Sequence, residues 1–143
     1  MVPRSAYAAM LASLAACAPA LVGTYVGTVT SEGSEGRSKP ADIGVKISSP
    51  TADYLRFTTN DTKNLRCSGE YTMTTWSANA FTAVGSGGCD VPDPECGILS
   101  LVLNGGHGEL VHDRLTATFN WTAACAKTQR SAPIAEIYEL TKQ

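Results

Sequence analysis

The chain has 143 residues, with 11 Lys and Arg against 13 Asp and Glu. The charges are scattered along it, which excludes the basic footprint of a nucleic-acid-binding protein and a polybasic patch for anionic lipid. The length suits one domain with a core of its own, and no internal repeat or change of composition indicates a second.

The first element is a short apolar segment. Arg4 precedes a run from Ser5 to Ala16 that contains no charged residue. One positive charge followed by roughly a dozen apolar or small residues is typical of a secretory signal, and the run is too short to span a bilayer.

The signal ends in Leu14-Ala15-Ala16-Cys17, which resembles the lipobox of bacterial lipoproteins. The resemblance implies that residues 1–16 are a signal peptide and that Cys17 becomes the first residue, carrying diacylglycerol and palmitate-type acyl chains. Two or more chains hold a protein on a membrane durably. Residues 17–20 would then be the acylated Cys and a short tether, and residues 21–143 a single domain.

The tether also indicates where the domain would sit. The residue after Cys17 is Ala18 and not Asp, and in the family this favours the outer membrane. Three residues reach about 10 Å at most, so the domain would lie close to the lipid. The alternative is ordinary signal cleavage at Ala18-Pro19-Ala20, which would release a soluble secreted domain.

The domain has no amphipathic helical pattern. It has runs of β-branched and aromatic residues with a period of two, separated by Gly, Pro, Asn, Asp and Ser, which predict strands. Eight strands are predicted, over residues 21–31, 43–47, 55–59, 65–75, 80–85, 98–103, 115–121 and 134–141. Asn104-Gly105-Gly106 is expected to end the sixth.

Eight short strands with tight connections favour an all-β fold, an antiparallel up-and-down barrel, with a sandwich as the alternative. In the barrel, alternate connections fall at the same end. Four long loops, 32–41, 60–64, 85–97 and 123–132, are therefore expected at the pole away from the N-terminus. This pole is the predicted working face.

Four cysteines remain once Cys17 is assigned to the anchor, and an even number in an exported chain predicts two disulfides. Their distances from the hairpin centres favour Cys67–Cys89 and Cys96–Cys125. The alternative is Cys89–Cys96 with Cys67–Cys125. The spacing excludes a zinc site of paired short Cys motifs.

No stretch carries recognisable catalytic or cofactor chemistry. The segment 89–96 holds three carboxylates but lacks the spacing of a calcium-binding EF-hand loop, and it is interpreted as a solvated acidic loop. His107 to His112 differs from the zinc-protease motif in the position of its Glu and is expected on a turn. Nucleophile, P-loop and dinucleotide motifs are absent from the sequence. We therefore expect no catalysis, no metal and no cofactor.

Two further resemblances concern the domain. Gly23-Thr24-Tyr25 is similar to the Gly-x-Trp opening of lipocalin and calycin barrels, with Tyr in place of Trp, and implies a small apolar ligand in the barrel. Ser68-Gly69-Glu70-Tyr71 resembles the Ser-Gly-x-x-Tyr loop of small lipid-anchored barrels that inhibit lysozyme, but it is one residue shorter.

These observations predict a lipid-anchored protein of the bacterial cell envelope. Its β-domain would have a non-catalytic binding or structural role, with a small apolar ligand or another envelope protein as partner. The alternative is an inhibitor of an enzyme such as lysozyme or a protease.

Overall fold

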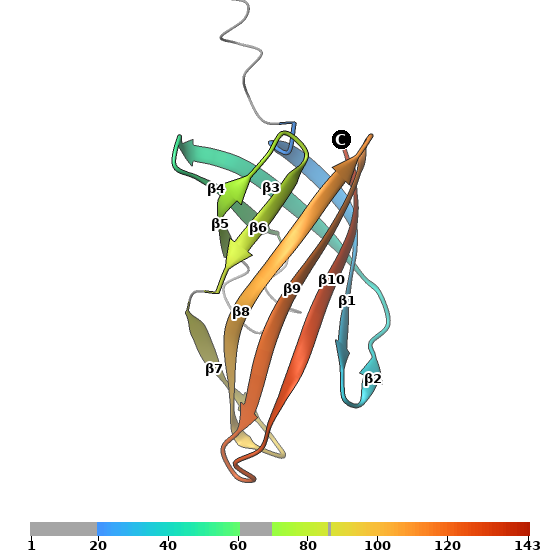
Figure 1. The fold of residues 1–143 in the computed structure, drawn as a ribbon. Coiled ribbons are helices and arrows are strands. Elements are labelled where there is room, and N and C mark those ends of the chain that lie inside the picture. Colours follow the sequence, from blue (N-terminus) through green and yellow to red (C-terminus); the bar gives the residue numbers. More distant parts are fainter. Residues whose placement is uncertain (1–19, 61–69, 86) are drawn as a thin grey trace, which may run out of the picture.

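The computed structural model describes residues 20–60, 70–85 and 87–143, and every regular element in these ranges is a strand. Figure 1 shows the arrangement. The strands are β1 (Gly23–Gly33), β2 (Gly36–Arg37), β3 (Ala41–Thr51), β4 (Tyr54–Thr59), β5 (Glu70–Trp76), β6 (Ala80–Val84), β7 (Gly88–Asp93), β8 (Gly97–Val111), β9 (Arg114–Cys125) and β10 (Ser131–Lys142).

Eight of these strands form a closed antiparallel barrel. Around it the order is β1, β3, β4, β5, β6, β8, β9 and β10. The last strand pairs with the first, from Tyr25 opposite Lys142 to Glu32 opposite Ala135, and this pairing closes the ring. The predicted up-and-down barrel is therefore confirmed and the sandwich is excluded. Closure removes the two free edges that an open sheet would expose.

The remaining two strands are short additions that the sequence did not predict. Strand β2 folds back on the end of β1 as a small hairpin, with Gly33 opposite Gly36. Strand β7 pairs with the first half of β8, while β6 pairs with the second half. The prediction that residues 85–97 form a loop is therefore wrong for Gly88–Asp93, because this segment pairs with β8 as an antiparallel strand.

Strand β8 also corrects the expected break at Asn104-Gly105-Gly106. The strand runs on to Val111, with an irregularity in its pairing to β9 between Leu103 and Gly105. Gly105 has φ +149°, and a Cβ on Gly106 would lie 2.6 Å from the Phe119 ring. The glycines therefore let the strand bend and leave room for a neighbouring aromatic ring, as glycines inside strands often do. His107 to Val111 consequently lies in a strand and not on the expected turn.

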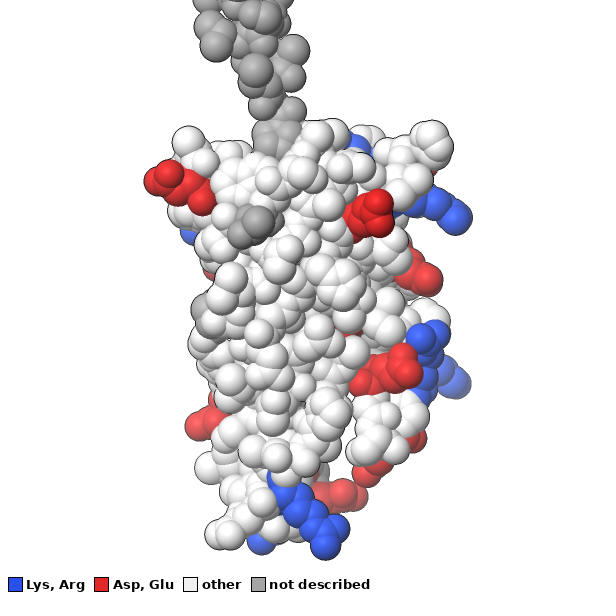
Figure 2. Space-filling view, in the orientation of Figure 1, with Lys and Arg blue, Asp and Glu red and all other residues white. Residues whose placement is uncertain are grey.

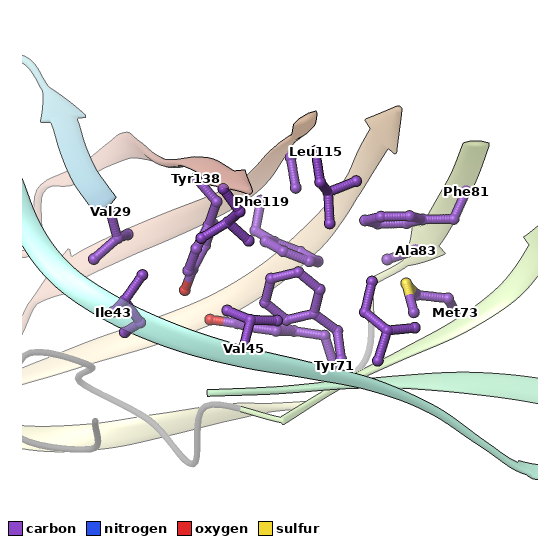
Figure 3. Close-up of a cluster of buried hydrophobic side chains, with 14 of the residues drawn as sticks. Val29, Ile43, Val45, Tyr71, Met73, Phe81, Ala83, Leu115, Phe119 and Tyr138 are labelled. Carbon is purple, nitrogen blue, oxygen red and sulfur yellow. The ribbon is translucent and has the colours of Figure 1, made fainter. Parts of the chain in front are cut away.

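The barrel is filled in its middle by aromatic side chains from several strands. The Phe119 ring stacks on Tyr71 with 4.0 Å between ring centroids. Phe57 meets Phe119 and Tyr138 edge to face, at 5.1 Å and 5.2 Å. Figure 3 shows this cluster, with the hydroxyl oxygens of Tyr71 and Tyr138 on the same side of it. Buried residues alternate with more exposed ones along β8 and β9, which is the pattern that predicted the strands.

The two ends of the barrel differ, as Figure 1 shows. The N-terminal pole carries the start of β1, the turns at 51–54, 76–80 and 111–114, and the C-terminus. The far pole carries the β1–β2 hairpin tip and the turns at 93–97 and 125–131. The connections near residues 32–41, 85–97 and 123–132 therefore lie at the pole away from the N-terminus, as expected. Of the fourth loop, residues 61–64 lie outside the described residues.

One disulfide, Cys96–Cys125, joins the start of β8 to the end of β9 at the far pole. This bond excludes the alternative pairing through Cys67–Cys125. Cys89 is also disulfide-bonded. Cys67 lies outside the described residues, and its pairing with Cys89 stays a prediction.

Candidate functional site

One carboxyl group points into the barrel. The inward positions of β10 include Tyr138, which is fully buried, and Leu140, which is 3% exposed. Glu136 has the same parity as these residues, because side chains two apart on a strand share a face. It is half-buried. The strand pattern thus places a carboxyl group at the end of the aromatic core.

Two tyrosines of the core contact this group. The Tyr71 hydroxyl donates to Oε1 of Glu136 at 3.3 Å, and the Tyr138 hydroxyl donates to Oε2 at 3.0 Å. Burial first, and then the negative charge of Glu136, raise the pKa of both tyrosines above the ordinary value. Both hydroxyls therefore stay protonated and continue to donate to the carboxylate.

A cavity of about 440 Å³ opens beside Glu136 at the far pole. It lies between the β1–β2 hairpin and the inner side of β8, β9 and β10; we call it the mouth cavity. The hairpin contributes one wall, and the opposite wall is mainly apolar. The residues that line it are 31–38, Leu101, Trp121, Ala132, Pro133, Ile134 and Glu136.

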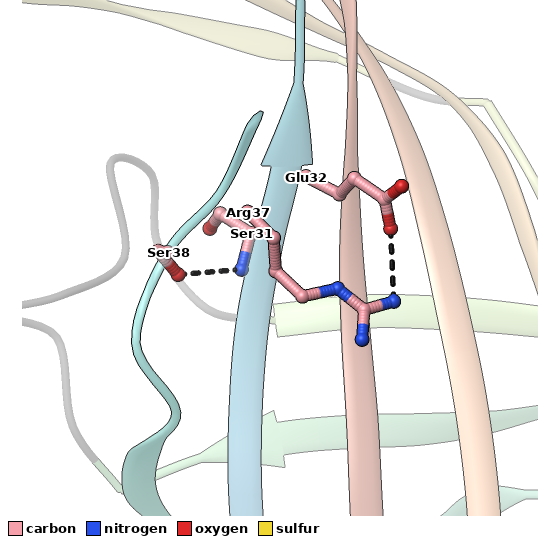
Figure 4. A network of polar contacts seen from close by, with 4 residues as sticks. All are labelled: Ser31, Glu32, Arg37 and Ser38. Carbon is pink, nitrogen blue, oxygen red and sulfur yellow. Dashed lines mark hydrogen bonds and ion pairs between the residues drawn. The ribbon is translucent and has the colours of Figure 1, made fainter. Parts of the chain in front are cut away.

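The hairpin wall is held by polar contacts near the cavity (Figure 4). Arg37 pairs with Glu32 at 3.0 Å, and the Ser31 N–H donates to Ser38 Oγ at 2.9 Å. Three of the lining residues are acidic, Glu32, Glu35 and Glu136, and Arg37 is the basic one. Figure 2 shows charged atoms around the hairpin at the lower right, beside the uncharged middle of this face. The hairpin wall is thus polar and charged, whereas the opposite wall is mainly apolar.

Trp121 gives the apolar wall a polar atom. Its side chain is 6% exposed. The indole Nε1 is buried and, in the part of the chain that the structure describes, has no hydrogen-bond partner. A buried donor left without an acceptor is rare in proteins. A molecule or water that accepts from this group would stabilise the site.

Two of the residues singled out in the sequence, Cys17 and Cys67, lie outside the described residues. The acidic segment 89–96 has a structural role. In the acidic segment, Asp90 accepts from the Ser100 hydroxyl, and Asp93 Oδ1 accepts from the N–H groups of Glu95 and Cys96. These two carboxylates stabilise β7 and its turn to β8. The described residues contain no group of three His, Cys, Asp or Glu side chains that could hold a metal ion.

The two motifs that carried resemblances have structural roles where they are described. Tyr25 is fully buried, and its hydroxyl donates to the carbonyl of Leu21 at 2.6 Å. Tyr71 is in the aromatic core, while Ser68 and Gly69 lie outside the described residues. The aromatic side chains fill the middle of the barrel, and the mouth cavity lies at the far pole.

Sequence reasoning missed Glu136 and Trp121 as residues of one site. The signal was present in the predicted strand at 134–141, where Glu136 has the parity of the apolar Ile134, Tyr138 and Leu140. An acidic side chain on the buried face of a strand is unusual and points to a function or a specific partner.

Comparisons with known proteins add little to this description. No protein-family model matches the chain, and no curated protein matches it significantly. One matching solved structure is EF1p2_mFAP2b bound to DFHBI, at 12% identity and a TM-score of 0.39, covering 87% of this chain and 94% of that one. No helix among the described residues is long and apolar enough to cross a membrane.

Proposed function

We propose that this chain is a lipid-anchored protein of the bacterial envelope whose barrel binds a small amphipathic molecule in the mouth cavity. The observation that carries the binding role is the cavity itself. Its 440 Å³ falls within the range of small-molecule sites, roughly 300–1,000 Å³, and it combines apolar walls with a few polar groups.

The anchor and the cavity fit together in this proposal. The lipobox-like Leu14-Ala15-Ala16-Cys17 supports acylation at Cys17 and a place in the cell envelope, with the outer membrane favoured by Ala18. Leu21 lies at the N-terminal pole, three residues after Ala18, so that pole would face the lipid. The mouth cavity is at the opposite pole and would open away from the membrane.

The intact mass of protein extracted with detergent from a bacterial host tests the anchor. We expect a chain that starts at Cys17 with added acyl groups, and the variant Cys17→Ser should lose them. An unlipidated chain that starts near Leu21 would contradict the anchor. It would leave the binding role untouched.

Native mass spectrometry of the same protein tests the binding role. We expect an extra mass that is lost on denaturation. Ala132→Phe should fill the cavity and abolish the extra mass, whereas Ala135→Phe, on the opposite face of the same strand, should retain it. If the wild type carries no ligand and takes up no small amphiphile, the binding role is wrong.

Inhibition of an enzyme is a second candidate, and one feature favours it. The turn at 93–97 is short and rigid, because Asp93 holds two of its N–H groups and Cys96 is cross-linked to Cys125. Rigid exposed turns of this kind suit the active-site clefts of enzymes, since little entropy is lost on binding. Titration against lysozyme and common proteases tests it, and undiminished activity of those enzymes would exclude it.

A further inference from the structure

We infer that the mouth cavity binds an uncharged molecule with an apolar body and an acceptor oxygen, such as a ketone, an aldehyde or an ester, and that this oxygen accepts a hydrogen bond from the indole of Trp121. The inference rests on the proposed binding function and specifies the chemistry of its ligand. It is carried by a buried donor and by the apolar side chains beside it.

The indole of Trp121 has a donor that the described part of the barrel leaves unused. The side chain is almost fully buried, it lines the mouth cavity, and its Nε1 has no hydrogen-bond partner among the described residues. An indole nitrogen donates and does not accept, so only an acceptor can satisfy it. Because a buried donor without an acceptor costs free energy, a ligand that supplies an acceptor gains affinity at this position.

The neighbours of Trp121 hold its ring at the cavity. In the strand pairing it lies opposite Leu103 of β8 and Ile134 of β10. The ring of Tyr71 meets it edge to face, with 6.0 Å between ring centroids. Glu136 lines the same cavity, but its carboxylate accepts from Tyr71 and Tyr138 and not from the indole. The packing therefore fixes the ring and leaves its N–H for a bound molecule.

Access to this N–H requires a small adjustment of the cavity, because Nε1 itself is covered. The hairpin that forms the other wall is tied by the ion pair between Arg37 and Glu32, and both of these side chains are exposed. Exposed ion pairs contribute little to stability. The hairpin wall can therefore yield to a ligand at low cost, while the strands of the barrel keep their places.

The lining favours a ligand without a charge. Leu101 and Ile134 line the cavity together with Trp121, so an aromatic or aliphatic group would pack against them. Arg37 is the basic residue of the lining, and it pairs with Glu32 at 3.0 Å. A carboxylate has acceptor sites for several donors, and one neutral N–H would replace little of the water that it loses on burial. A neutral carbonyl loses less hydration and suits a single donor.

The test uses three probes that share a phenyl ring, namely acetophenone, ethylbenzene and benzoate. Binding is followed by two-dimensional ¹H–¹⁵N NMR, which gives one indole signal for each of the two tryptophans. Trp121→Phe assigns the signals. We expect acetophenone to move the Trp121 indole proton downfield, because its carbonyl oxygen accepts from that N–H. Ethylbenzene has the same ring without an acceptor and should not, and benzoate should bind more weakly than acetophenone.

A matched pair of variants tests the source of the hydrogen bond. Trp121→Phe should weaken acetophenone about tenfold relative to ethylbenzene, equivalent to about 1.4 kcal/mol, because only the ketone loses a hydrogen bond. The loss of ring contact affects both probes and cancels in the ratio of their affinities. Trp76→Phe makes the same change in β5, at a residue that does not line the cavity, and should leave this ratio unchanged. If Trp121→Phe fails to fold, the proton shifts of the wild type still decide.

The outcomes separate the two proposals. If acetophenone binds but shifts the Trp121 proton no further downfield than ethylbenzene does, the assigned hydrogen bond is wrong and the cavity remains a binding site. Equal ratios in Trp121→Phe and Trp76→Phe would also overturn it. Benzoate that binds as tightly as acetophenone would overturn the preference for an uncharged ligand. Binding of none of the three probes would count against the proposed binding function itself.

Discussion

The hydroxyl of Tyr71 lies 3.3 Å from Oε1 of Glu136, a residue 65 positions further along the chain. The contact crosses the interior of the barrel, from β5 to β10. It lies where the aromatic core ends and the mouth cavity begins. Tyr71 and Tyr138, which donate to Glu136 there, are both buried.

The stability of the protein should fall above pH 10. Burial raises the pKa of Tyr25 to about 12, and that of Tyr71 and Tyr138 is raised by burial and by Glu136. In the unfolded chain these groups lose their protons near pH 10, while the folded chain keeps them. The unfolded state then binds fewer protons, so the free energy of unfolding decreases as pH rises from about 10.

Urea unfolding at pH 8 to 12 measures this effect. Each buried tyrosine should contribute up to about 1.4 kcal/mol per pH unit in that window. Tyr25→Phe should make the free energy of unfolding fall less steeply with pH, because one of the buried tyrosines is removed. It should also cost about 1 kcal/mol at neutral pH, because the buried Leu21 carbonyl loses its donor. A free energy of unfolding that is flat between pH 10 and 12 would contradict the prediction.

Removing the Cys96–Cys125 disulfide should lower stability without opening the barrel. The bond closes a loop with a sequence separation of 29, for which chain entropy predicts a contribution of about 3–4 kcal/mol. The double variant Cys96→Ala with Cys125→Ala is compared with the wild type by denaturant unfolding. The strand pairing of β8 with β9 should persist in NMR spectra, and a loss below about 1 kcal/mol would show that the unfolded chain is already compact there.

A methyl group at Gly106 should be poorly tolerated. Its Cβ would lie 2.6 Å from a carbon of the Phe119 ring and 2.7 Å from the Thr118 carbonyl oxygen. Gly106→Ala should therefore cost about 1–3 kcal/mol by overpacking the core. Gly33→Ala is the matched control, because its Cβ would meet neighbours at an ordinary 3.7 Å. Equal unfolding midpoints for the two variants would contradict this account.

The ion pair on the hairpin should add almost nothing to stability. The side chains of Arg37 and Glu32 are 62% and 50% exposed, and exposed pairs contribute about 0–1 kcal/mol. Glu32→Gln should change the free energy of unfolding by less than about 0.5 kcal/mol in 150 mM salt. A larger loss would indicate that the hairpin depends on this contact for its position.

Much of the barrel could be predicted because its strands alternate cleanly. Ile43, Val45 and Ile47 point inward from β3, as do Leu115, Ala117, Phe119 and Trp121 from β9. The pairing Cys96–Cys125 followed from equal distances to a hairpin turn. These features depend on local periodicity and on simple connections between neighbouring strands, which a sequence shows directly.

The predictions that were wrong concern segments whose structure depends on contacts between residues distant in the sequence. Gly105 and Gly106 are typical of a turn, yet they lie within β8, where the Phe119 ring occupies the space that a side chain at position 106 would need. Segment 88–93 contains Pro92 and two aspartates and has a loop-like composition, but β8 offers it a pairing edge. The mouth cavity is lined by residues more than 100 positions apart in the sequence. The one sign of it in the sequence was that Glu136 shares a strand face with the apolar Ile134, Tyr138 and Leu140.

The pairing of β1 with β10 has a consequence for how the protein folds. Tyr25 faces Lys142, so the ring closes between segments at opposite ends of the described chain. Such non-local pairing makes folding slow, because the entropy of bringing the segments together is lost before many contacts form. Until β10 pairs with β1, the unfinished sheet has unpaired edges that can join those of another molecule, so a chaperone that covers these edges should raise the yield of folded protein.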